Sequence, residues 1–352
     1  MENAAVIIPT LNREKHLRRC VESLINNKEA GMTDLYISVD YPPSDKYRDG
    51  YVEVIEYVKT ITGFATVNLY FQEKNLGPGL NRKYLEQMIS EKHDKYVFTD
   101  DDNEFSENFL AYINWGLEKY KDDELVYAIC STSDFDICKN GNKSDYLMIP
   151  AYNPYGVGHW LHKNKKCAEY LKQESLNEIY KTKEKQRLLY HYSPMVYMWV
   201  ANDSIRRVSP MRGRDDSLTY IDIWENVYCI ENKMTCIIPA VTKSRNWGLD
   251  GSGVHENIND VADYVPCIEL DYRNEWTASP IRFDKDTEEL NRVSHKEKFS
   301  ISKKEIKTSN CLYVLNSILG NALTYGVFKI IKSLYKKIFK KDSSDKNEIM
   351  YG

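Results

Sequence analysis

The sequence has no uninterrupted apolar stretch of about 18 residues or more, which is the length that a membrane-spanning helix requires. It also has no signal-peptide pattern, because the acidic Glu2 stands where positive charge is expected and Pro9 ends the first apolar run early. We therefore expect a cytoplasmic protein that is either soluble or bound peripherally to a membrane surface.

The eight cysteines form no CxxC pair and no Cys/His cluster at zinc-site spacing, which is typical of reduced thiols in a cytosol. We expect no disulfide framework. Charge of one sign is not in excess either, because 48 Lys and Arg against 52 Asp and Glu give a formal net charge of -4. The composition therefore does not predict nucleic acid as a partner.

What the sequence does contain is an alternation of strand-like and helix-like patterns over about the first hundred residues. Such alternation is typical of βαβ units around a mainly parallel sheet. We expect strands at residues 4–8, 35–39, 66–72 and 96–99, with helices at 14–26, 51–62 and 79–91. In open parallel sheets the ligand crevice lies at the carboxyl ends of the strands, so the residues after each strand are the candidates for a site.

Three consecutive acids, Asp100, Asp101 and Asp102, directly follow the strand predicted at residues 96–99. Their mutual repulsion is tolerable where they hold a cation or transfer protons. Oxygen ligands suit Mg²⁺ or Mn²⁺, and such a metal also neutralises a diphosphate leaving group. The alternative is an acidic cap on the helix that begins near Ser106, but a cap needs one acid rather than three.

Several segments resemble those of one enzyme family. Residues 6–13, Val-Ile-Ile-Pro-Thr-Leu-Asn-Arg, resemble the opening of family 2 glycosyltransferases. Residues 97–109 are similar to the strand, DXD-type motif and following helix of that fold, and they also resemble N-acetylglucosaminyltransferase I-like enzymes. Residues 154–161 are similar to a Gly-x-Gly-Trp stretch, and residues 246–255 to a glycine-rich loop over the pyrophosphate. The resemblance spans about residues 4–256 and implies the GT-A fold, a Rossmann-like, mainly parallel sheet flanked by helices.

The resemblance also implies how the acidic run is used. It implies that Asp102 binds the metal directly and that Asp100 and Asp101 contact the ribose or the sugar. It further implies that His255, in the late glycine-rich loop, completes the metal site from a second loop, for which imidazole is suited. The alternative for this histidine is a structural or surface position.

Asp222 is the predicted catalytic base, because residues 220–224 resemble a helix start at which family members carry an aspartate in a Trp-rich context. Inverting glycosyl transfer needs a base near the acceptor hydroxyl and a cation at the leaving phosphates. Glu225, Asp215 and Asp216 remain competitors for the role of base, and a simple helix cap remains an alternative role for Asp222.

The residues that follow the predicted strands are expected to bind the nucleotide sugar. These are Pro9, Thr10, Asn12, Arg13, Asp40, Asn75, Gly77 and Arg82, together with Asp100 and Asp101. Thr10 and Arg13 would approach the base and ribose, and Arg82 would face the phosphates. Asp40 would accept hydrogen bonds from the base or ribose. The alternative is that Asp40 is a simple turn residue before Pro42 and Pro43. A turn into a helix explains the glycines around Gly77 equally well.

The segment of residues 146–160 is rich in Trp, Tyr and Gly, and we expect it to be irregular. Sugar rings pack their C–H faces on aromatic rings, so this composition suits a wall that faces carbohydrate. Within it, Gly158 and Trp160 are the residues expected to shape the acceptor or donor-sugar side.

The expected domains are a GT-A catalytic domain at 1–260 (nucleotide-sugar half about 1–130, acceptor half about 131–260), an irregular wrapping segment at 261–305 and a basic amphipathic helical tail at 306–352. From about residue 311 to 341 the tail alternates apolar residues with lysines and contains no acid. Such a helix suits an anionic membrane surface. The alternative is a helix that packs on the domain and exposes its lysines.

These features together predict an inverting, metal-dependent glycosyltransferase of hexosyl or N-acetylhexosaminyl groups, with Mn²⁺ or Mg²⁺. The donor would be a nucleotide-diphosphate sugar, with UDP favoured and GDP open. The acceptor would be a saccharide, free or lipid-linked, in surface polysaccharide synthesis at the inner face of the cell membrane. The alternatives are a catalytically silent carbohydrate-binding protein of the same fold and a nucleotidyltransferase, although the sequence has no GxxxxGK[ST] loop.

Overall fold

The structure, a computed structural model, describes residues 2–133, 145–171, 179, 182–208, 221–248, 250, 252, 269–271, 273, 275–276, 281–282, 304 and 306–314. The chain divides into two compact units, one of residues 1–170 and 221–291 and the other of residues 171–220 and 292–352. Of the sequence predictions, His255, most of the segment 261–305 and the tail after residue 314 lie outside the described residues.

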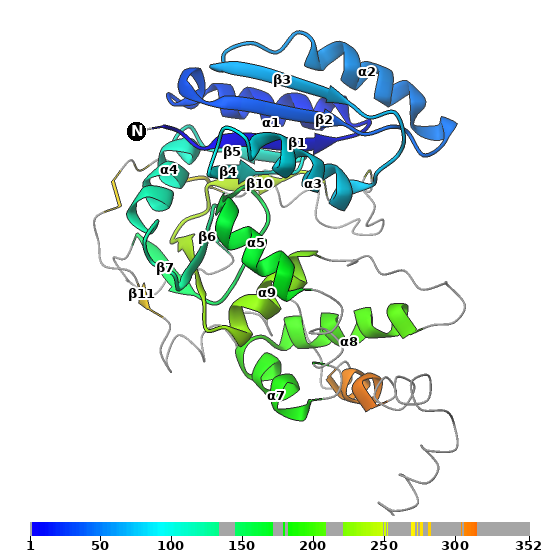
Figure 1. The fold of residues 1–352 in the computed structure, drawn as a ribbon, viewed down its shortest axis with the longest axis vertical. Helices are drawn as coiled ribbons and strands as arrows, with labels where there is room; N and C mark the ends of the chain where they lie inside the picture. Colours follow the sequence, from blue (N-terminus) through cyan, green and yellow to red (C-terminus); the bar gives the residue numbers. More distant parts are fainter. Residues whose placement is uncertain are drawn as a thin grey trace, which may run out of the picture. The chain divides into compact units, whose positions relative to one another are not determined.

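The first unit is built on one sheet, which within the described residues has nine strands in the order β11-β7-β9-β6-β8-β4-β1-β2-β3 (Figure 1). The strands are β1 (Ala5–Thr10), β2 (Asp34–Val39), β3 (Thr66–Phe71), β4 (Lys95–Phe98), β6 (Val126–Cys130), β7 (Tyr146–Ile149), β8 (Val157–Trp160), β9 (Thr235–Pro239) and β11 (Ile281–Arg282). The pairs β1–β2, β2–β3, β1–β4 and β6–β9 are parallel, whereas β8 runs antiparallel to both β4 and β6. The predicted α/β fold with a mainly parallel sheet is confirmed.

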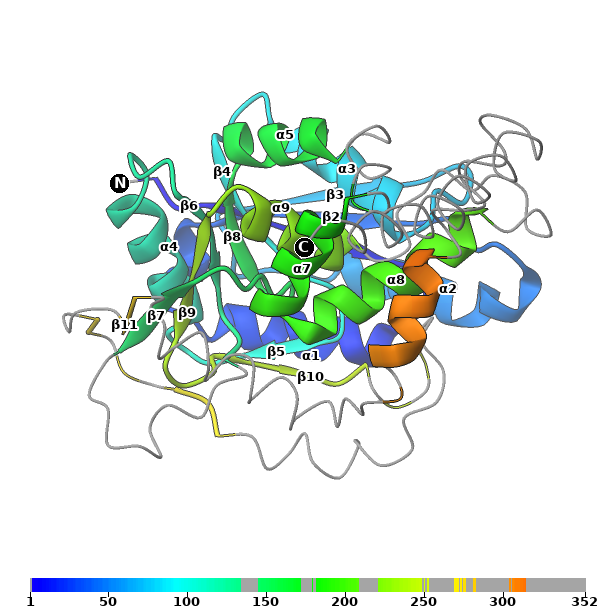
Figure 2. The ribbon, with the colours of Figure 1, turned by 90° about the horizontal axis from the view of Figure 1, so that it is seen from below.

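Helices cover both faces of this sheet. They are α1 (Glu14–Ile25), α2 (Arg48–Val58), α3 (Pro78–Ile89), α4 (Phe109–Lys119), α5 (Leu161–Tyr170) and α9 (Ile221–Glu231), with short 3-10 turns η1 (Ala30–Met32) and η2 (Asp45–Tyr47). Strand β1 is buried at every position, as expected for an apolar strand with helices on both sides. Figure 2 shows α3 and α5 on one side of the sheet and α1 on the other.

Successive side chains of each strand point to opposite faces of the sheet, and each face packs against its own layer of helices. Val6 and Ile8 of β1 belong to one core with Leu17 and Val21 of α1, because these helix positions repeat at three- to four-residue spacing. On the opposite face, Ser38 of β2 donates a hydrogen bond to the side chain of an asparagine of α3 (2.5 Å). The sheet therefore separates an apolar layer against α1 from a layer against α3 that contains hydrogen-bonded polar side chains.

The aromatic segment of residues 146–160 differs from the expectation of an irregular wall. It supplies β7 and β8, which insert into the sheet as antiparallel neighbours of β9, β4 and β6. A Cβ atom added to Gly158 would lie 2.6 Å from a methyl group of Ile113 and 3.2 Å from Leu117. Gly158 is therefore required for close packing of β8 on α4.

A small second sheet pairs β5 (Asn103–Phe105) with β10 (Ser244–Asn246) in antiparallel register. The pairing joins residues more than a hundred positions apart in the sequence, with Asn246 opposite Asn103. It brings the start of the late glycine-rich segment beside the acidic run that precedes β5. The position of this late segment beside the acidic run therefore depends on one long-range strand pairing, and the order of elements along the chain does not reveal it.

In the second unit the described elements are helical: α7 (Lys183–Tyr192), α8 (Pro194–Val208) and residues 306–314. Tyr197 of α8 donates a hydrogen bond to Asn310 (2.5 Å), and Tyr313 donates one to the carbonyl oxygen of Tyr197 (2.8 Å). The first residues of the predicted tail thus dock on α8 through tyrosines. No helix in the described part of the chain combines the length and apolar character needed to cross a membrane.

Candidate active site

A cavity of about 520 Å³ opens at the carboxyl ends of β1 and β2. Its lining includes Pro9, Thr10, Asn12 and Arg13 after β1, Asp40 after β2, Asn75 and Gly77 before α3, and Asp100 and Asp101 of the acidic run. These are residues that the sequence assigns to nucleotide-sugar binding. The loops that carry them come together because their strands are parallel neighbours that end at the same edge of the sheet.

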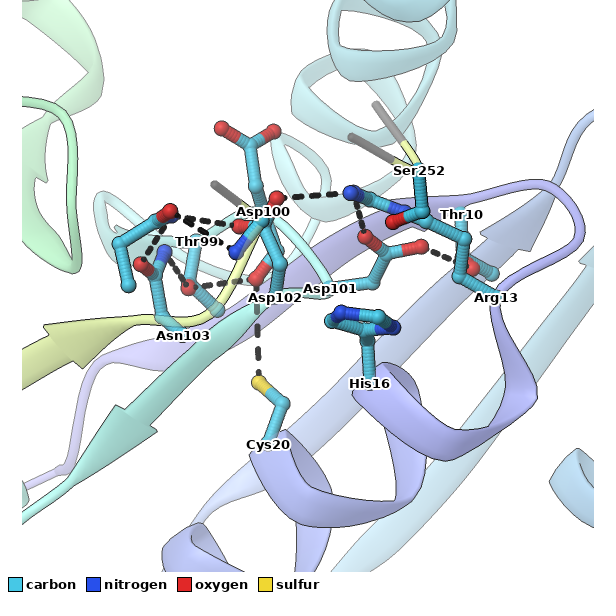
Figure 3. Close-up of polar contacts among 12 residues, drawn as sticks. Thr10, Arg13, His16, Cys20, Thr99, Asp100, Asp101, Asp102, Asn103 and Ser252 are labelled. Carbon is cyan, nitrogen blue, oxygen red and sulfur yellow. Dashed lines mark hydrogen bonds and ion pairs between the residues drawn. The ribbon is translucent and has the colours of Figure 1, made fainter. Parts of the chain in front are cut away.

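The backbone of the acidic run is held by a residue that directly follows β4 and by a residue of α1. The hydroxyl of Thr99 and the thiol of Cys20 both donate to the carbonyl oxygen of Asp100, at 2.8 and 3.8 Å (Figure 3). Next along the run, the carboxylate of Asp101 accepts a hydrogen bond from Thr10 (2.7 Å) and pairs with the guanidinium of Arg13. Asp101 is buried and thus serves to hold Arg13 against the run.

Asp102 is engaged by residues from two distant segments. Its carboxylate pairs with Arg13 (2.9 Å) and accepts a hydrogen bond from the side-chain amide of Asn246 (2.8 Å). A Cβ atom at Gly248 would lie 2.1 Å from the same carboxylate, so the backbone of the late segment approaches as closely as glycine allows. The sequence predicted the late loop near this site, but it did not single out Asn246, because the β5–β10 pairing leaves no local signal.

Asp100 differs from its neighbours because its carboxyl group has no hydrogen-bond partner among the described residues (Figure 3). It lines the cavity. Burial, together with the negative charges of Asp102 and Asp101, raises the pKa of Asp100 to about 7, against the lowering effect of Arg13. A partnerless acid in a cavity, repelled by two others, is a group whose charged form a bound cation would stabilise.

The donor set of the acidic run suits a hard divalent cation, because it consists of carboxylate oxygens alone within the described residues. Within the described part of the chain, neither carboxyl oxygen of Asp100 has a hydrogen-bond partner, whereas Asp102 has one oxygen on the side-chain amide of Asn246 and the other on Arg13. Arg13 supplies one positive charge against three negative ones. Among the described residues no group of three or more His, Cys, Asp or Glu side chains is arranged to hold a metal ion, so the run offers Asp100 and Asp102 as two candidate ligands.

Asp40 organises the opposite wall of the cavity. Its carboxylate accepts hydrogen bonds from the backbone N–H groups of Tyr41, Leu76 and Gly77 at 2.9, 2.8 and 2.8 Å, and from the side chain of Asn75 at 3.2 Å. A carboxylate has about four lone-pair sites, so these contacts use its accepting capacity. Asp40 therefore ties the loop before α3 to the end of β2, in addition to lining the cavity.

Replacement of Asp40 by Ala is expected to lower the free energy of unfolding by about 1–3 kcal/mol, because the N–H groups of Leu76 and Gly77 lose their partner. Nucleotide affinity should fall with it, since Asn75 and Gly77 line the cavity. Thermal unfolding and calorimetric titration with UDP and GDP measure the two effects. Asp40→Asn keeps one acceptor oxygen and should lie between wild type and Asp40→Ala. Wild-type stability in Asp40→Ala would contradict this role.

Among the described residues, Asp102 is next to the cavity lining but not part of it, and four other predicted site residues lie away from the cavity wall. Gly158 and Trp160 are buried within β8, and the amino group of Lys163 lies 3.8 Å from the centre of the Trp160 ring. Arg82 is buried beneath β4, where its guanidinium lies 4.1 Å from the centre of the Phe98 ring. Asp222 lies in the first turn of α9 and is half-buried. Neither periodicity nor motif spacing distinguished these positions from exposed ones.

Glu225, a competitor of Asp222 for the role of base, is buried on α9. Its carboxylate pairs with Arg82 (3.3 Å) and accepts a hydrogen bond from Tyr127 (3.0 Å). Burial raises the pKa of Glu225 to about 7 from its usual 4.5, although Arg82 and Tyr127 act in the opposite direction. These contacts assign Glu225 to the interior of the domain.

The pKa of Glu225 has a consequence for stability. Between pH 4.5 and about 7 the folded protein holds a proton on Glu225 that the unfolded chain releases, so the free energy of unfolding falls as pH rises through this window. Glu225→Gln removes this titratable carboxyl group. The slope of the free energy of unfolding against pH should therefore become shallower by the equivalent of about one bound proton. Chemical denaturation at pH 4.5–8 measures the slope, and Glu53→Gln, at an exposed position of α2, should retain it. An unchanged slope in Glu225→Gln would argue against a protonated Glu225.

The sequence matches the family model described as "Glycosyl transferase family 2" over residues 5–193. A search of curated proteins found no match. Solved structures to which this chain is similar include GalNAc-T7 with UDP, GalNAc and Mn²⁺, at 12% identity over 69% of this chain and 43% of that chain, with a TM-score of 0.39. The mannosyltransferase PcManGT from Pyrobaculum calidifontis, in complex with GDP-Man and Mn²⁺, has 14% identity over 51% of this chain and 52% of that chain, with a TM-score of 0.35.

The crystal structure of S. aureus TarS is also similar, at 14% identity over 47% of this chain and 29% of that chain, with a TM-score of 0.33. The chain thus covers less than two thirds of the length of each of these three proteins. The family model, by contrast, covers more than half of the present chain and includes the cavity loops after β1, β2 and β3 as well as the acidic run. On this match, the chain belongs to glycosyl transferase family 2.

Proposed function

We propose that this protein is an inverting, metal-dependent glycosyltransferase that uses a nucleotide-diphosphate sugar. The observation that carries the proposal is the carboxyl group of Asp100, which has no hydrogen-bond partner among the described residues and lies in a cavity of about 520 Å³ beside the Arg13 ion pairs. A cavity of this volume suits a nucleotide with its sugar. The acids and the arginine supply sites for a cation and for the charged phosphates, respectively.

The chain's own residues divide the work of the proposed reaction. Asp100 and Asp102 would hold a divalent cation, which when bound would neutralise the charge that develops on the leaving diphosphate. Arg13 is held at the cavity by Asp101 and Asp102, so its guanidinium is oriented before the donor arrives. Asp40 and Asn75 shape the wall on the side of β2.

Asp222 would remove the proton of the acceptor hydroxyl, with Glu225 excluded by its burial. Helix α9 leads into β9, which runs parallel to β6, and β6 points the same way as β1. The first turn of α9 therefore lies toward the edge of the sheet at which the cavity opens. This topology supports an acceptor that approaches from the side of α9.

The donor is proposed to carry UDP, with GDP as the alternative base, and the acceptor to be a saccharide, free or lipid-linked, in surface polysaccharide synthesis. A peripheral position at the inner membrane face, through the basic tail of residues 306–352, belongs to the same proposal. His255 is proposed as a further metal ligand from the late loop. These finer assignments follow from the family resemblance and from the lysine pattern of the tail.

A donor screen tests the proposed function. Purified full-length protein is incubated with UDP- and GDP-sugars, with Mn²⁺ or with EDTA, and release of nucleoside diphosphate is recorded. Release from one donor that requires Mn²⁺ supports the transferase and identifies the sugar. Binding of UDP or GDP without release from any donor, with candidate saccharide acceptors present, would instead indicate a catalytically silent carbohydrate-binding protein. Absence of both binding and release would contradict the proposal.

A further inference from the structure

Arg82, which the sequence assigned to the phosphates, points into the protein interior instead. Its side chain is 6% exposed, and its guanidinium pairs with Glu86 one turn later on α3 (2.9 Å) and with Glu225 of α9 (3.3 Å). It also lies against the face of Phe98, the last residue of β4. A buried cation is retained only where its charge is paired and its donors are satisfied, and these contacts provide both.

The partner carboxylate is equally enclosed. Glu225 is 4% exposed and accepts hydrogen bonds from both Arg82 and Tyr127 of β6. The neighbouring residue, Asn226, forms a second anchor: its side chain accepts from the backbone N–H of Tyr152 (2.8 Å) and donates to the carbonyl oxygen of Tyr152 (2.9 Å). Helix α9 is thus attached to α3 by one residue and to the loop before β8 by the next.

The two helices that the ion pair joins carry different parts of the proposed site. Gly77, Pro78 and Asn81, at and near the start of α3, line the cavity, and Arg82 follows directly after Asn81. Asp222 lies one helical turn before Glu225 on α9. The Arg82–Glu225 contact thus lies between the part of α3 that borders the cavity and the turn of α9 that carries Asp222, and the Asn226 contacts attach α9 to the domain separately.

We propose that the buried Arg82–Glu225 ion pair is a positioning element, which sets the first turn of α9, with Asp222, relative to the donor cavity beside α3. The inference rests on the proposed function, because it assigns Asp222 to the acceptor. It gives Arg82 and Glu225 a role in transfer without contact between either side chain and the substrate. Neither residue is a catalytic residue in this arrangement.

The test compares Arg82→Met, Arg82→Lys and Glu225→Gln with the wild type at about pH 8, above the window in which Glu225 holds a proton. We expect kcat to fall by up to about 100-fold in Arg82→Met and Glu225→Gln, because small misplacements of a base are costly. The Kd for UDP or GDP should change less than about threefold, since the cavity wall stays in place. Arg82→Lys keeps the charge and should recover part of kcat. The double variant Arg82→Met/Glu225→Gln should be no worse than either single variant, because the two residues act as one unit.

Lys163→Met is the matched control. Lys163 is also buried, but it donates to the carbonyl oxygens of Asp123 and Val126 (2.7 Å each) at the start of β6, on the edge opposite the cavity. The Lys163→Met variant should be less stable than the wild type and should retain the wild-type kcat. The proposal is overturned if kcat is unchanged in Arg82→Met, if Kd rises in step with the loss of kcat, or if Lys163→Met loses kcat to the same extent.

Amide hydrogen exchange gives a readout that does not depend on activity. Arg82→Met should exchange about tenfold faster than wild type in peptides covering residues 221–226, whereas Lys163→Met should not. If the wild type released no nucleoside diphosphate from any donor, the proposed function would fail, and the exchange result would still decide whether the ion pair positions α9. Unchanged exchange in residues 221–226 of Arg82→Met would overturn the positioning role by itself.

Discussion

Replacement of Asp100 by Asn is expected to lower metal-dependent release of nucleoside diphosphate by about two orders of magnitude. A metal that neutralises a leaving diphosphate stabilises the transition state by several kcal/mol, and each 1.4 kcal/mol or so corresponds to a factor of ten in rate. Asp100 lines the cavity and is the acid of the run without a hydrogen-bond partner in the described part of the chain. Its loss therefore removes a ligand without breaking a contact that holds the fold.

The pH dependence of metal binding should report the same group. Because burial raises the pKa of Asp100 to about 7, a falling pH protonates it and removes a ligand, so Mn²⁺ affinity should weaken as pH decreases from 8 to 6. In Asp100→Asn this pH dependence should be largely lost. Titration of the Mn²⁺ signal by electron paramagnetic resonance, with UDP and with GDP present, measures the affinity directly.

Two comparison variants make the result specific. Asp45→Asn removes the same charge from an exposed side chain in η2 and should leave release unchanged. Asp102→Asn removes the carboxylate that the sequence resemblance assigned to the metal, but in the structure that group also holds Arg13 and Asn246. If Asp102→Asn lost Mn²⁺ affinity while Asp100→Asn retained it, the leading role of Asp100 would be contradicted.

The part of the site that the sequence predicted is the part that local chain order determines. Each βα unit ends its strand at the same edge, so polar residues that directly follow β1, β2 and β4 had to converge. Thr10, Asp40 and Asp101 line the cavity for this reason. Strand–loop–helix order is encoded within a few residues, and a single sequence is sufficient to detect it.

The remaining parts depend on pairings between distant segments. Trp160 occupies an antiparallel strand inserted between β4 and β6, and a short strand rich in aromatics has no periodicity that separates it from a loop. Arg82 meets Glu225 across 143 positions in the sequence, so a basic residue after a glycine turn was equally compatible with a phosphate contact. Asn246 reaches Asp102 only through the β5–β10 pairing.

Replacement of Gly50 by Ala is expected to have a large effect on stability. The sign of this effect is opposite to the one that helix propensity predicts. Gly50 lies in α2, where alanine normally stabilises a helix by about 0.5–1 kcal/mol relative to glycine. Here a Cβ atom would lie 2.2 Å from the carbonyl oxygen of Asn12 and 3.2 Å from its carbonyl carbon. Gly50→Ala should therefore destabilise the protein by about 1–3 kcal/mol, because a backbone group cannot move aside as a side-chain end can.

The clash should also reach the ligand, because Asn12 lines the cavity between Thr10 and Arg13. If α2 pushes the Asn12 carbonyl away, the loop after β1 moves, and the affinity for UDP or GDP falls together with the melting temperature. Gly79→Ala is the matched control: Gly79 is also helical and lies beside the cavity in α3, but a Cβ atom there meets nothing within 4 Å. It should gain stability and bind nucleotide as the wild type does. Equal stability of Gly50→Ala and Gly79→Ala would show that α2 is not in close contact with the loop after β1. That outcome would contradict the prediction.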